Sequence, residues 1–385
     1  MLGVRRRGFE VSRSPATAAL GLAGRAVTAV GTSGSASDFT PQPGFTGSLV
    51  GSTLTIGRGA GGFGTKANAA TPLLYMPLAT SVAPSALGRV TSSRTLEGLT
   101  FSATGGADGN GCLTGTGVNG AGDNVWTVRL ESDDWAGYTY DWNSYDQKIF
   151  ISRLVKKNFG DLSGTTAAYN VKDVRFWGRS AGGLIQAPST YFSPSLGRFG
   201  TENLPNSPYF DYVMNETVRA NAGSIQNRWY REEIVIKVNS AATNTGPTTD
   251  QEYKWSVDGG NYILKSPYTT YDTFYLRWKN ASGDVNDGRL RTMFPVHKVV
   301  DSGTGSRPVA PVGSVYQVDD LYVDDSWCRV VAGDSSTYAS CTDRWPLPVI
   351  AWSDTSVTVN TASTPYKNVF VVPNTDVSLY AGDLP

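Results

Sequence analysis

Alternation of apolar and polar residues is the main pattern along the chain from about residue 95. It is clearest over 229–239, where Tyr230 and Ile236 fall on one face. Arg231 and Glu233 fall on the other face of the same segment. A period of two predicts a β-strand that buries one face and exposes the other to solvent.

Other segments repeat this pattern, and turn residues separate them. The further expected strands are 125–130, 148–155, 174–177, 253–257 and 273–279. The turn at 258–261 reads Asp-Gly-Gly-Asn, residues that tolerate positive φ, and predicts a hairpin that continues into 262–264. No stretch of ten or more residues has an apolar stripe with the helical period. The sequence therefore predicts an all-β sandwich or barrel.

The first residues differ from this pattern. Residues 31–70 are dense in Gly, Ser, Thr and Ala, which is typical of a linker or of short strands. The first 37 residues carry five arginines against Glu10 alone; the arginines are Arg5, Arg6, Arg7, Arg13 and Arg25. A segment made largely of Arg, Ser, Gly and Ala has little core of its own, so we interpret it as an assembly arm that grips neighbouring subunits.

An export signal is the alternative for the same segment. Residues 6–9 read Arg-Arg-Gly-Phe, similar to a twin-arginine signal, and a small apolar stretch follows at 16–23. Arg25 interrupts that stretch where a signal should stay apolar. The arm is therefore the favoured interpretation.

Composition and charge exclude several classes of protein. The 33 Lys and Arg residues balance 33 Asp and Glu residues, which argues against a nucleic-acid partner. Aromatic residues reach 11% and charged residues only 17%, unlike a disordered chain. No apolar run reaches the roughly 18 residues of a membrane-spanning helix, so we expect no membrane partner.

Cysteine and histidine offer little chemistry. No Cys-x-x-C pair is present among Cys112, Cys328 and Cys341, which argues against a thiolate zinc site. Cys328 and Cys341 are either a disulfide across a hairpin or two buried free thiols. His297 is the only histidine, and we expect it in a loop or at a strand edge in a structural or solvated role.

A family resemblance rests on three C-terminal segments. Residues 318–324 read Val-Asp-Asp-Leu-Tyr-Val-Asp, 352–356 read Trp-Ser-Asp-Thr-Ser, and 367–372 end in paired valines. Together they resemble the C-terminal part of concanavalin-A-like (laminin-G/polysaccharide-lyase-like) jelly rolls of the type found in bacteriophage virion structural proteins. The resemblance covers roughly 95–375, is most specific over 316–372, and implies a jelly-roll sandwich.

The predicted organisation has four parts. Residues 1–45 are an extended basic arm, and 46–94 are a Gly/Ser-rich linker or short strands. Residues 95–335 form the jelly-roll β-sandwich, and 336–385 supply C-terminal strands that complete or extend it.

Catalytic patterns of the resembled fold are missing. Glycanases need two carboxylates about 5–9.5 Å apart, and the related glucanases carry a Glu-x-Asp-x-x-Glu pattern. The nearest segment here, 131–134, lacks it and is typical of a strand end and turn. Related lyases carry a Gln-hydrophobic-His strand, whereas His297 follows a Pro-Val pair. We therefore do not expect an enzyme.

One segment suggests carbohydrate binding. Aromatic rings stack on sugars while carboxylates accept hydrogen bonds from sugar hydroxyls. The candidate residues are Trp135, Tyr138, Tyr140, Trp142 and Tyr145, interleaved with Asp134 and Asp141. Burial of these aromatic residues in the sandwich core or a subunit contact is the alternative, and the Tyr-rich composition favours it.

Four carboxylates in seven residues suggest a Ca²⁺ site. The candidate ligands are Asp319, Asp320 and Asp324, with Asp325 beside them. Neighbours on a regular strand point to opposite faces, so Asp319 and Asp320 could not both converge on one ion. A solvated strand with hydrogen-bonded turn carboxylates is the favoured alternative, and no other cofactor is expected.

The functional hypothesis is a phage virion structural protein, either a capsid decoration or cement protein or a fibre-type subunit. Its lectin-like jelly roll would be exposed on the particle. The expected partners are other virion subunits, further copies of the chain and host-surface glycans. The alternative hypothesis is an exported carbohydrate-active protein, a lectin or polysaccharide lyase, with an N-terminal signal.

Overall fold

A computed structural model describes much of the chain after residue 38. The described ranges are 39–66, 70–89, 95–116, 124–131, 148–158, 171–172, 174–178, 189–193, 198–202, 210–213, 227–237, 252–259, 263–264, 278–279, 285–286, 290–300, 315–361, 364–374 and 378–384. All of them belong to one compact unit, Ser35–Pro385. The predicted arm arginines lie outside the described residues.

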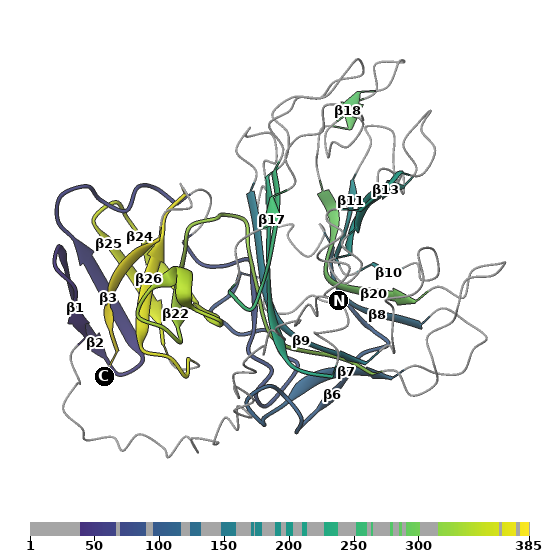
Figure 1. The fold of residues 1–385 in the computed structure, drawn as a ribbon, viewed down its shortest axis with the longest axis horizontal. Coiled ribbons are helices and arrows are strands. Elements are labelled where there is room, and N and C mark those ends of the chain that lie inside the picture. Colours follow the sequence, from purple (N-terminus) through teal and green to yellow (C-terminus); the bar gives the residue numbers. More distant parts are fainter. Residues whose placement is uncertain are drawn as a thin grey trace, which may run out of the picture. The chain divides into compact units, whose positions relative to one another are not determined.

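The described residues form antiparallel sheets (Figure 1). The one helix among them is a single 3-10 turn, Tyr338–Ser340. No described helix is long and apolar enough to cross a membrane. The all-β class predicted from the period-two pattern is confirmed.

The central sheet has eight strands in the order β17-β16-β15-β9-β21-β7-β6, with β4 also paired to β21. Its strands are β4 (Leu74–Met76), β6 (Thr100–Ser102), β7 (Cys112–Thr116), β9 (Lys148–Asn158), β15 (Tyr230–Lys237), β16 (Glu252–Val257), β17 (Ile263–Leu264) and β21 (Val315–Asp324). The predicted segments 148–155, 229–239 and 253–257 each contain a strand of this sheet.

A second eight-stranded sheet has the order β14-β13-β12-β11-β20-β8-β5, with β10 paired to β20. Its strands are β5 (Thr95–Glu97), β8 (Asn124–Glu131), β10 (Val171–Lys172), β11 (Val174–Gly178), β12 (Ser189–Ser193), β13 (Arg198–Glu202), β14 (Phe210–Val213) and β20 (Leu290–Val300). A short pair, β18 (Trp278–Lys279) with β19 (Val285–Asn286), is separate. His297 lies within β20, opposite Thr127 of β8, rather than in a loop.

The remaining strands build a third body, which we call the terminal sandwich. One of its sheets has the order β1-β27-β26-β22-β23 and the other β2-β3-β25-β24. Its strands are β1 (Thr40–Pro41), β2 (Phe45–Val50), β3 (Thr53–Arg58), β22 (Arg329–Gly333), β23 (Arg344–Leu347), β24 (Val349–Trp352), β25 (Ser356–Asn360), β26 (Asn368–Val372) and β27 (Leu379–Asp383).

Alternating apolar residues fill the terminal sandwich. Leu54 and Ile56 of β3 face inward beside Val357 and Val359 of β25, and all four are fully buried. They share one core cluster with Val330, Leu347, Val369 and Val371 of the other sheet. Close packing of inward-facing residues from two sheets is the usual construction of a β-sandwich.

This arrangement differs from the predicted organisation at the end of the arm. The arm was expected to reach residue 45, but β1 already pairs with β27 at Thr40 and Pro41. Strands after residue 335 were expected to complete or extend the sandwich. β23 and β26 pair with β22, which ends before residue 335, whereas β25 pairs with β3 and β27 with β1. The alternating apolar face of β3 packs in one core cluster with residues of β22, β25 and β26. Of the two interpretations of 46–94, short strands are present.

Candidate functional site

The charged face of β15 is buried, which corrects the expectation of a solvated face. Arg231 is 2% exposed and Glu233 is 1% exposed. Seven of the eight residues of β15 are buried. The alternation is real, but the face that carries the charges is covered by the connection between β22 and β23, whose side chains supply opposite charges.

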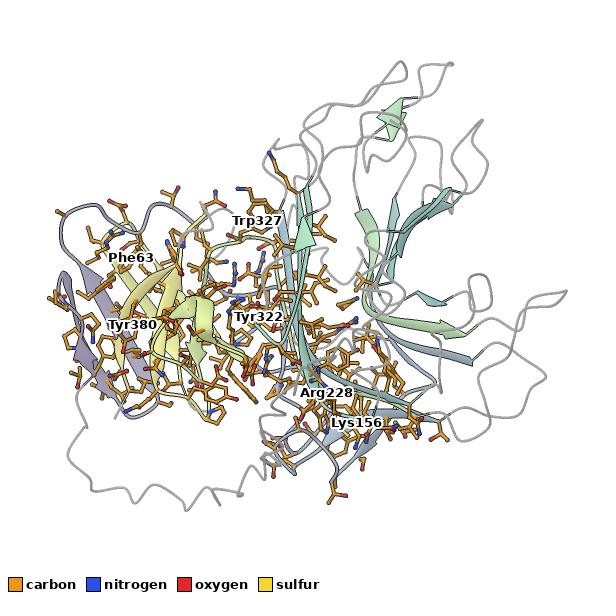
Figure 2. The ribbon with its side chains drawn as sticks, viewed as in Figure 1. Phe63, Lys156, Arg228, Tyr322, Trp327 and Tyr380 are labelled. Carbon is orange, nitrogen blue, oxygen red and sulfur yellow. The ribbon has the colours of Figure 1, made fainter. Side chains whose placement is uncertain are left out.

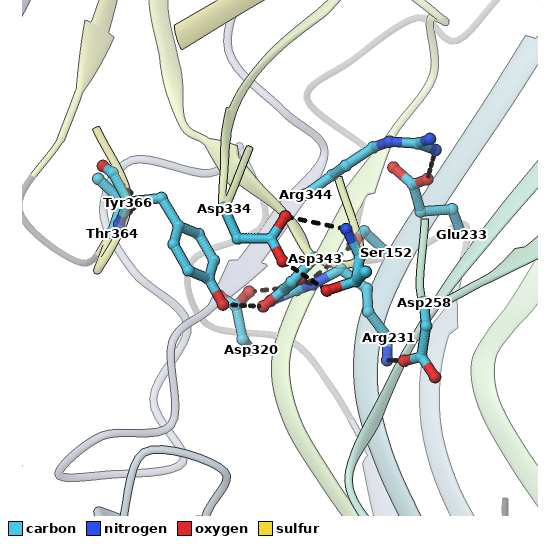
Figure 3. Close-up of polar contacts among 11 residues, drawn as sticks. Ser152, Arg231, Glu233, Asp258, Asp320, Asp334, Asp343, Arg344, Thr364 and Tyr366 are labelled. Atoms are coloured by element: carbon cyan, nitrogen blue, oxygen red, sulfur yellow. Dashed lines mark hydrogen bonds and ion pairs between the residues drawn. The ribbon is translucent and has the colours of Figure 1, made fainter. Parts of the chain in front are cut away.

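Arg231 is the centre of this buried network (Figure 3). Its Nη1 atom donates to Asp320 Oδ2 at 2.9 Å and to Ser152 Oγ at 3.1 Å. Its Nε atom donates to Asp343 Oδ1, and the hydroxyl of Tyr366 donates to Asp343 Oδ2 at 3.0 Å. Arg231 thus joins β9, β15 and β21 to the β22–β23 connection.

Electrostatics keeps this guanidinium charged. Burial alone lowers the pKa of Arg231, but the carboxylates of Asp343 and Asp320 outweigh that effect and raise it above its ordinary value. The guanidinium also lies over the ring of Trp345, with Cζ 4.9 Å from the ring centroid. The charge is therefore satisfied on several sides by groups that are themselves largely buried.

A second ion pair joins β15 to the first residue of β23, Arg344. Arg344 Nη1 lies 2.9 Å from Glu233 Oε2, and Arg344 Nη2 donates to the carbonyl oxygen of Gly259 at 2.5 Å. The ring of Tyr338 lies 4.1 Å from the Arg344 guanidinium. Gly259 has a φ of +64°, and an added Cβ there would overlap the Cys341 carbonyl, so this turn requires glycine.

The opposite face of the central sheet has its own ion pair. Arg153 of β9 contacts Glu232 Oε2 through Nε at 3.0 Å and through Nη2 at 2.7 Å. Its Nη1 atom donates to the carbonyl oxygen of Pro295 in β20 at 2.6 Å. Both side chains are at most 1% exposed. One arginine therefore links the two eight-stranded sheets.

The predicted Ca²⁺ ligands do not converge. Asp320 pairs with Arg231, and Asp324 pairs with Lys66 at 2.8 Å. Asp319 accepts from the backbone N–H groups of Ala107 at 2.9 Å and of Asp320 at 2.8 Å. Among the described residues no group of three or more His, Cys, Asp or Glu side chains could hold a metal ion.

The geometry of β21 explains this correction. The strand register shifts between Asp319 and Tyr322, and Asp320 has a φ of +43°. The bulge turns each carboxylate toward a different partner. The alternative of a solvated strand is also wrong, because Asp319, Asp320 and Asp324 are at most 3% exposed.

Burial changes the acidity of these carboxyl groups. Burial is the main cause that raises the pKa of Asp319 to about 7, that of Asp320 to about 6 and that of Asp324 to about 7. Shifts of this kind also occur in catalytic acids, but here each carboxylate is already bonded within the fold. The arrangement holds strands of the central sheet together.

Aromatic rings cover two cations near the end of β21, in the region where Figure 2 labels Tyr322 and Trp327. Lys148 Nζ lies 4.4 Å from the ring centroid of Trp327, and the guanidinium of Arg329 lies 4.3 Å from that of Phe150. Tyr322 packs edge-on against Phe150 and donates its hydroxyl to Asp324 Oδ2 at 3.0 Å. Tyr, Trp and Phe of this region are therefore core residues.

The cysteines are free thiols. Cys112, Cys328 and Cys341 are all buried and unpaired. Cys341 Sγ donates to the carbonyl oxygen of Thr337 at 3.3 Å, and Cys328 Sγ to that of Thr65 at 3.8 Å. Of the two alternatives left open by the sequence, the structure has the buried thiols, and the Cys328–Cys341 disulfide is absent.

Two sets of predicted residues lie outside the part of the chain that the structure describes. The aromatic and acidic segment that holds Trp135, Tyr138, Tyr140, Trp142 and Tyr145 lies outside the described residues, as does the arm. Sequence reasoning missed Arg153, Lys66 and the Arg231–Asp343 pair. A lone arginine in an apolar strand, as in Ile149–Val155, was the available signal for Arg153.

Comparison with known proteins gives likeness of fold only. No family model matches the chain, and no curated protein matches it. An endo-beta-1,4-glucuronan lyase from the fungus Trichoderma reesei is 12% identical with a TM-score of 0.33, covering 62% of this chain and 90% of that one. The alginate lyase vAL-1 from Chlorella virus is 11% identical with a TM-score of 0.33, covering 60% and 91%.

A toxin domain is similar to the same degree. The binding domain of botulinum neurotoxin serotype G is 10% identical with a TM-score of 0.35, covering 81% of this chain and 71% of that one. The similar structures thus include lyases and binding domains. At TM-scores below 0.5 they carry no inference about what this chain binds or catalyses.

Proposed function

We propose that this chain is a structural subunit of a bacteriophage particle, a decoration, cement or fibre-type protein. Its all-β body faces outward, and residues 135–145 contact host-surface glycans. The basic segment 1–38 binds neighbouring subunits as an assembly arm. The C-terminal sequence resemblance, with its Asp-Asp and Trp-Ser-Asp-Thr-Ser strands, motivates the particle assignment.

The observation that carries the proposal is that charged side chains are buried and bonded to one another. Arg153, Arg231 and Arg344 are each buried in ion pairs between strands, and so are their acidic partners. A catalytic acid or base must reach substrate, whereas these groups are bonded to one another across the sheets. Such a network favours a structural role for the protein.

Particle association is tested on native material. An antibody raised against the purified chain should label phage particles by immunogold electron microscopy, and the chain should co-sediment with them through a density gradient. The measured mass of the intact chain from particles should correspond to a chain that still includes the residues before 39. A chain found free in the medium, cut near residue 30 and absent from particles, would support the exported alternative.

Glycan binding is tested with a glycan array on the full chain. We expect binding that is lost in the double variant Trp135→Ala/Trp142→Ala. The matched control Ile350→Ala removes an exposed apolar side chain of β24 and should bind as the unaltered chain does. Circular dichroism of both variants checks that the fold is retained.

An assay for lyase activity separates binding from catalysis. Polysaccharide lyases create a double bond that absorbs ultraviolet light, so uronate polymers are incubated with the chain and followed by absorbance. We expect no increase. A steady increase would overturn the non-enzymatic part of the proposal while leaving the particle assignment to the labelling experiment.

A further inference from the structure

The four edge strands of the terminal sandwich differ in how they are protected. β1 has two residues and contains Pro41. β23 contains Pro346 and is buried along its length. β24 follows Pro348 and has a register shift between Val349 and Ala351. Proline, bulges and short length are the usual devices that prevent one sheet edge from pairing with another.

β2 has none of these devices. Its six residues, Phe45–Val50, contain no proline and no charged side chain, and its pairing with β3 is regular throughout. Among the described residues it pairs with β3 alone and ends its sheet (Figure 1). Thr46, Gly47 and Ser48 are exposed.

Val50 adds an apolar residue to this edge. It is 67% exposed, the larger of the two values among exposed large apolar residues in the described chain. The adjoining outer face of the sheet is uncharged, with Thr55 and Thr358 beside Ser48 in the register. The Phe45 N–H group donates to the Gln42 carbonyl oxygen at 3.0 Å, but no described strand pairs with this side of β2. The edge therefore combines a strand side without a partner strand among the described residues, an exposed apolar side chain and no repelling charge.

We propose that β2 pairs in antiparallel fashion with β2 of a second copy of this chain. The pairing would join two four-stranded sheets into one continuous sheet of eight strands about a two-fold axis. Strand addition at an exposed edge is a general mode of recognition in which backbone hydrogen bonds supply much of the affinity. A two-fold contact uses the same surface patch on both copies.

The alternation of faces sets the register. Residues directly opposite each other share a face of the sheet, so the two residue numbers of each pair must have the same parity. A pairing centred on Ser48 satisfies this rule and places Ser48 opposite Ser48 of the second copy. It also places Val50 opposite Thr46 and Leu49 opposite Gly47, where no side chain crowds the leucine.

The second copy is the favoured occupant because β2 is self-complementary. An uncharged strand can meet its own copy without placing like charges opposite each other, which would be destabilising. Six residues span about 20 Å of edge, a small contact beside a standard interface. We therefore expect an association that depends on concentration and strengthens when copies are held close together. The inference concerns this edge alone and does not rest on the proposed function.

The test is a charge swap at Ser48 in the full chain. Sedimentation velocity over a dilution series should show a dimer of the unaltered chain. Ser48→Lys and Ser48→Asp each place like charges opposite each other at the two-fold axis, so each should weaken dimerisation by about tenfold or more. An equal mixture of the two variants should restore the dimer, because Lys then faces Asp.

The control is Ala351→Lys, which adds a charge to an exposed position on β24, the opposite edge of the same sheet. It should dimerise as the unaltered chain does, and thermal melting should show that all three variants stay folded. An unaltered chain that remains monomeric throughout would overturn the proposal. So would a mixture that fails to recover the dimer, since that result would point to another occupant such as residues 1–38 of a neighbour.

Discussion

The terminal sandwich and the central sheet are both buried β-structures, but they are held together in different ways. The core cluster of the terminal sandwich is apolar and mostly aliphatic, built on residues such as Leu54, Val357 and Val371. The central sheet buries Arg153, Arg231, Glu232 and Glu233 instead, each with a partner of opposite charge. One region depends on removal of apolar surface from water, the other on exact matching of charges as well.

The difference lies in how each region responds to change. An aliphatic core that loses a methyl group keeps every other contact and suffers a graded loss. A buried ion pair that loses one partner leaves an uncompensated charge in a medium that solvates it poorly. The central sheet should therefore be the less tolerant of the two regions, and its stability should also depend on pH.

The largest effect is expected for Arg231→Ala. The change leaves Asp320 without its cationic partner, and also Asp343, whose contact with Arg231 is lost. We expect a loss of about 3–5 kcal/mol in the free energy of unfolding, measured by urea denaturation. Arg231→Lys keeps the charge but not the planar fork, so it should lose less. A loss below about 1 kcal/mol in the alanine variant would contradict the account of the central sheet.

A smaller and graded effect is expected for Leu54→Ala in the terminal sandwich. Leu54 is fully buried, and its removal creates a cavity in the aliphatic core. We expect a loss of about 3 kcal/mol in the same denaturation measurement. Unlike the loss in Arg231→Ala, it should be nearly the same at acidic and neutral pH, because no titrating group changes its surroundings.

The pH dependence of stability should come from the central sheet, and Asp319 is the clearest contributor. Burial raises its pKa from 3.8 to about 7, so the folded chain binds the proton more tightly than the unfolded chain. Its contribution to stability is fully present below about pH 4 and is lost as pH rises through about 7. One group can supply a slope of at most about 1.4 kcal/mol per pH unit.

The variant Asp319→Asn cannot titrate at this position and should lose that part of the slope. Urea denaturation at several pH values between about 5 and 8 measures the slope in both proteins. Equal slopes would show that Asp319 does not bind its proton more tightly in the folded chain.

The smallest effect is expected for Arg228→Ala. Arg228 pairs with Asp258 at 2.6 Å, but its side chain is 44% exposed. A solvated ion pair of this kind contributes at most about 1 kcal/mol, and salt should reduce its contribution further. The melting temperatures of the variant and the unaltered chain at low and high salt would show whether an exposed ion pair contributes less to stability than a buried one.

Local sequence patterns predicted the positions of strands well, but they predicted poorly which strand faces are buried and against which residues. The alternation in 229–239 identified β15, and the Asp-Gly turn after Val257 identified the hairpin of β16 and β17, because strand period and turn chemistry are local properties. The same pattern assigned Arg231 and Glu233 to solvent. Their partners Asp343 and Arg344 follow 112 and 111 residues later, and periodicity carries no information about such distant contacts.

The candidate site was harder to predict for the same reason. Three aspartates in β21 and a fourth just after it suggested one shared cation, but a bulge and a residue at positive φ separate their side chains. Each then meets a different cation or backbone group, among them Lys66, which lies 258 residues from Asp324 along the chain. Sequence spacing indicated the acidic cluster, while only the register of the strands decides which atoms meet.

The pairing of β3 with β25 has a consequence for biosynthesis. Thr55 and Thr358 hydrogen-bond across this pair although 303 residues separate them. At about 5–20 residues per second, a ribosome needs roughly 15–60 s to deliver the later strand after the earlier one. During that interval the apolar side of β3 lacks its final neighbours, so closure of this sandwich is expected to be among the last steps of maturation and the step most in need of chaperone protection.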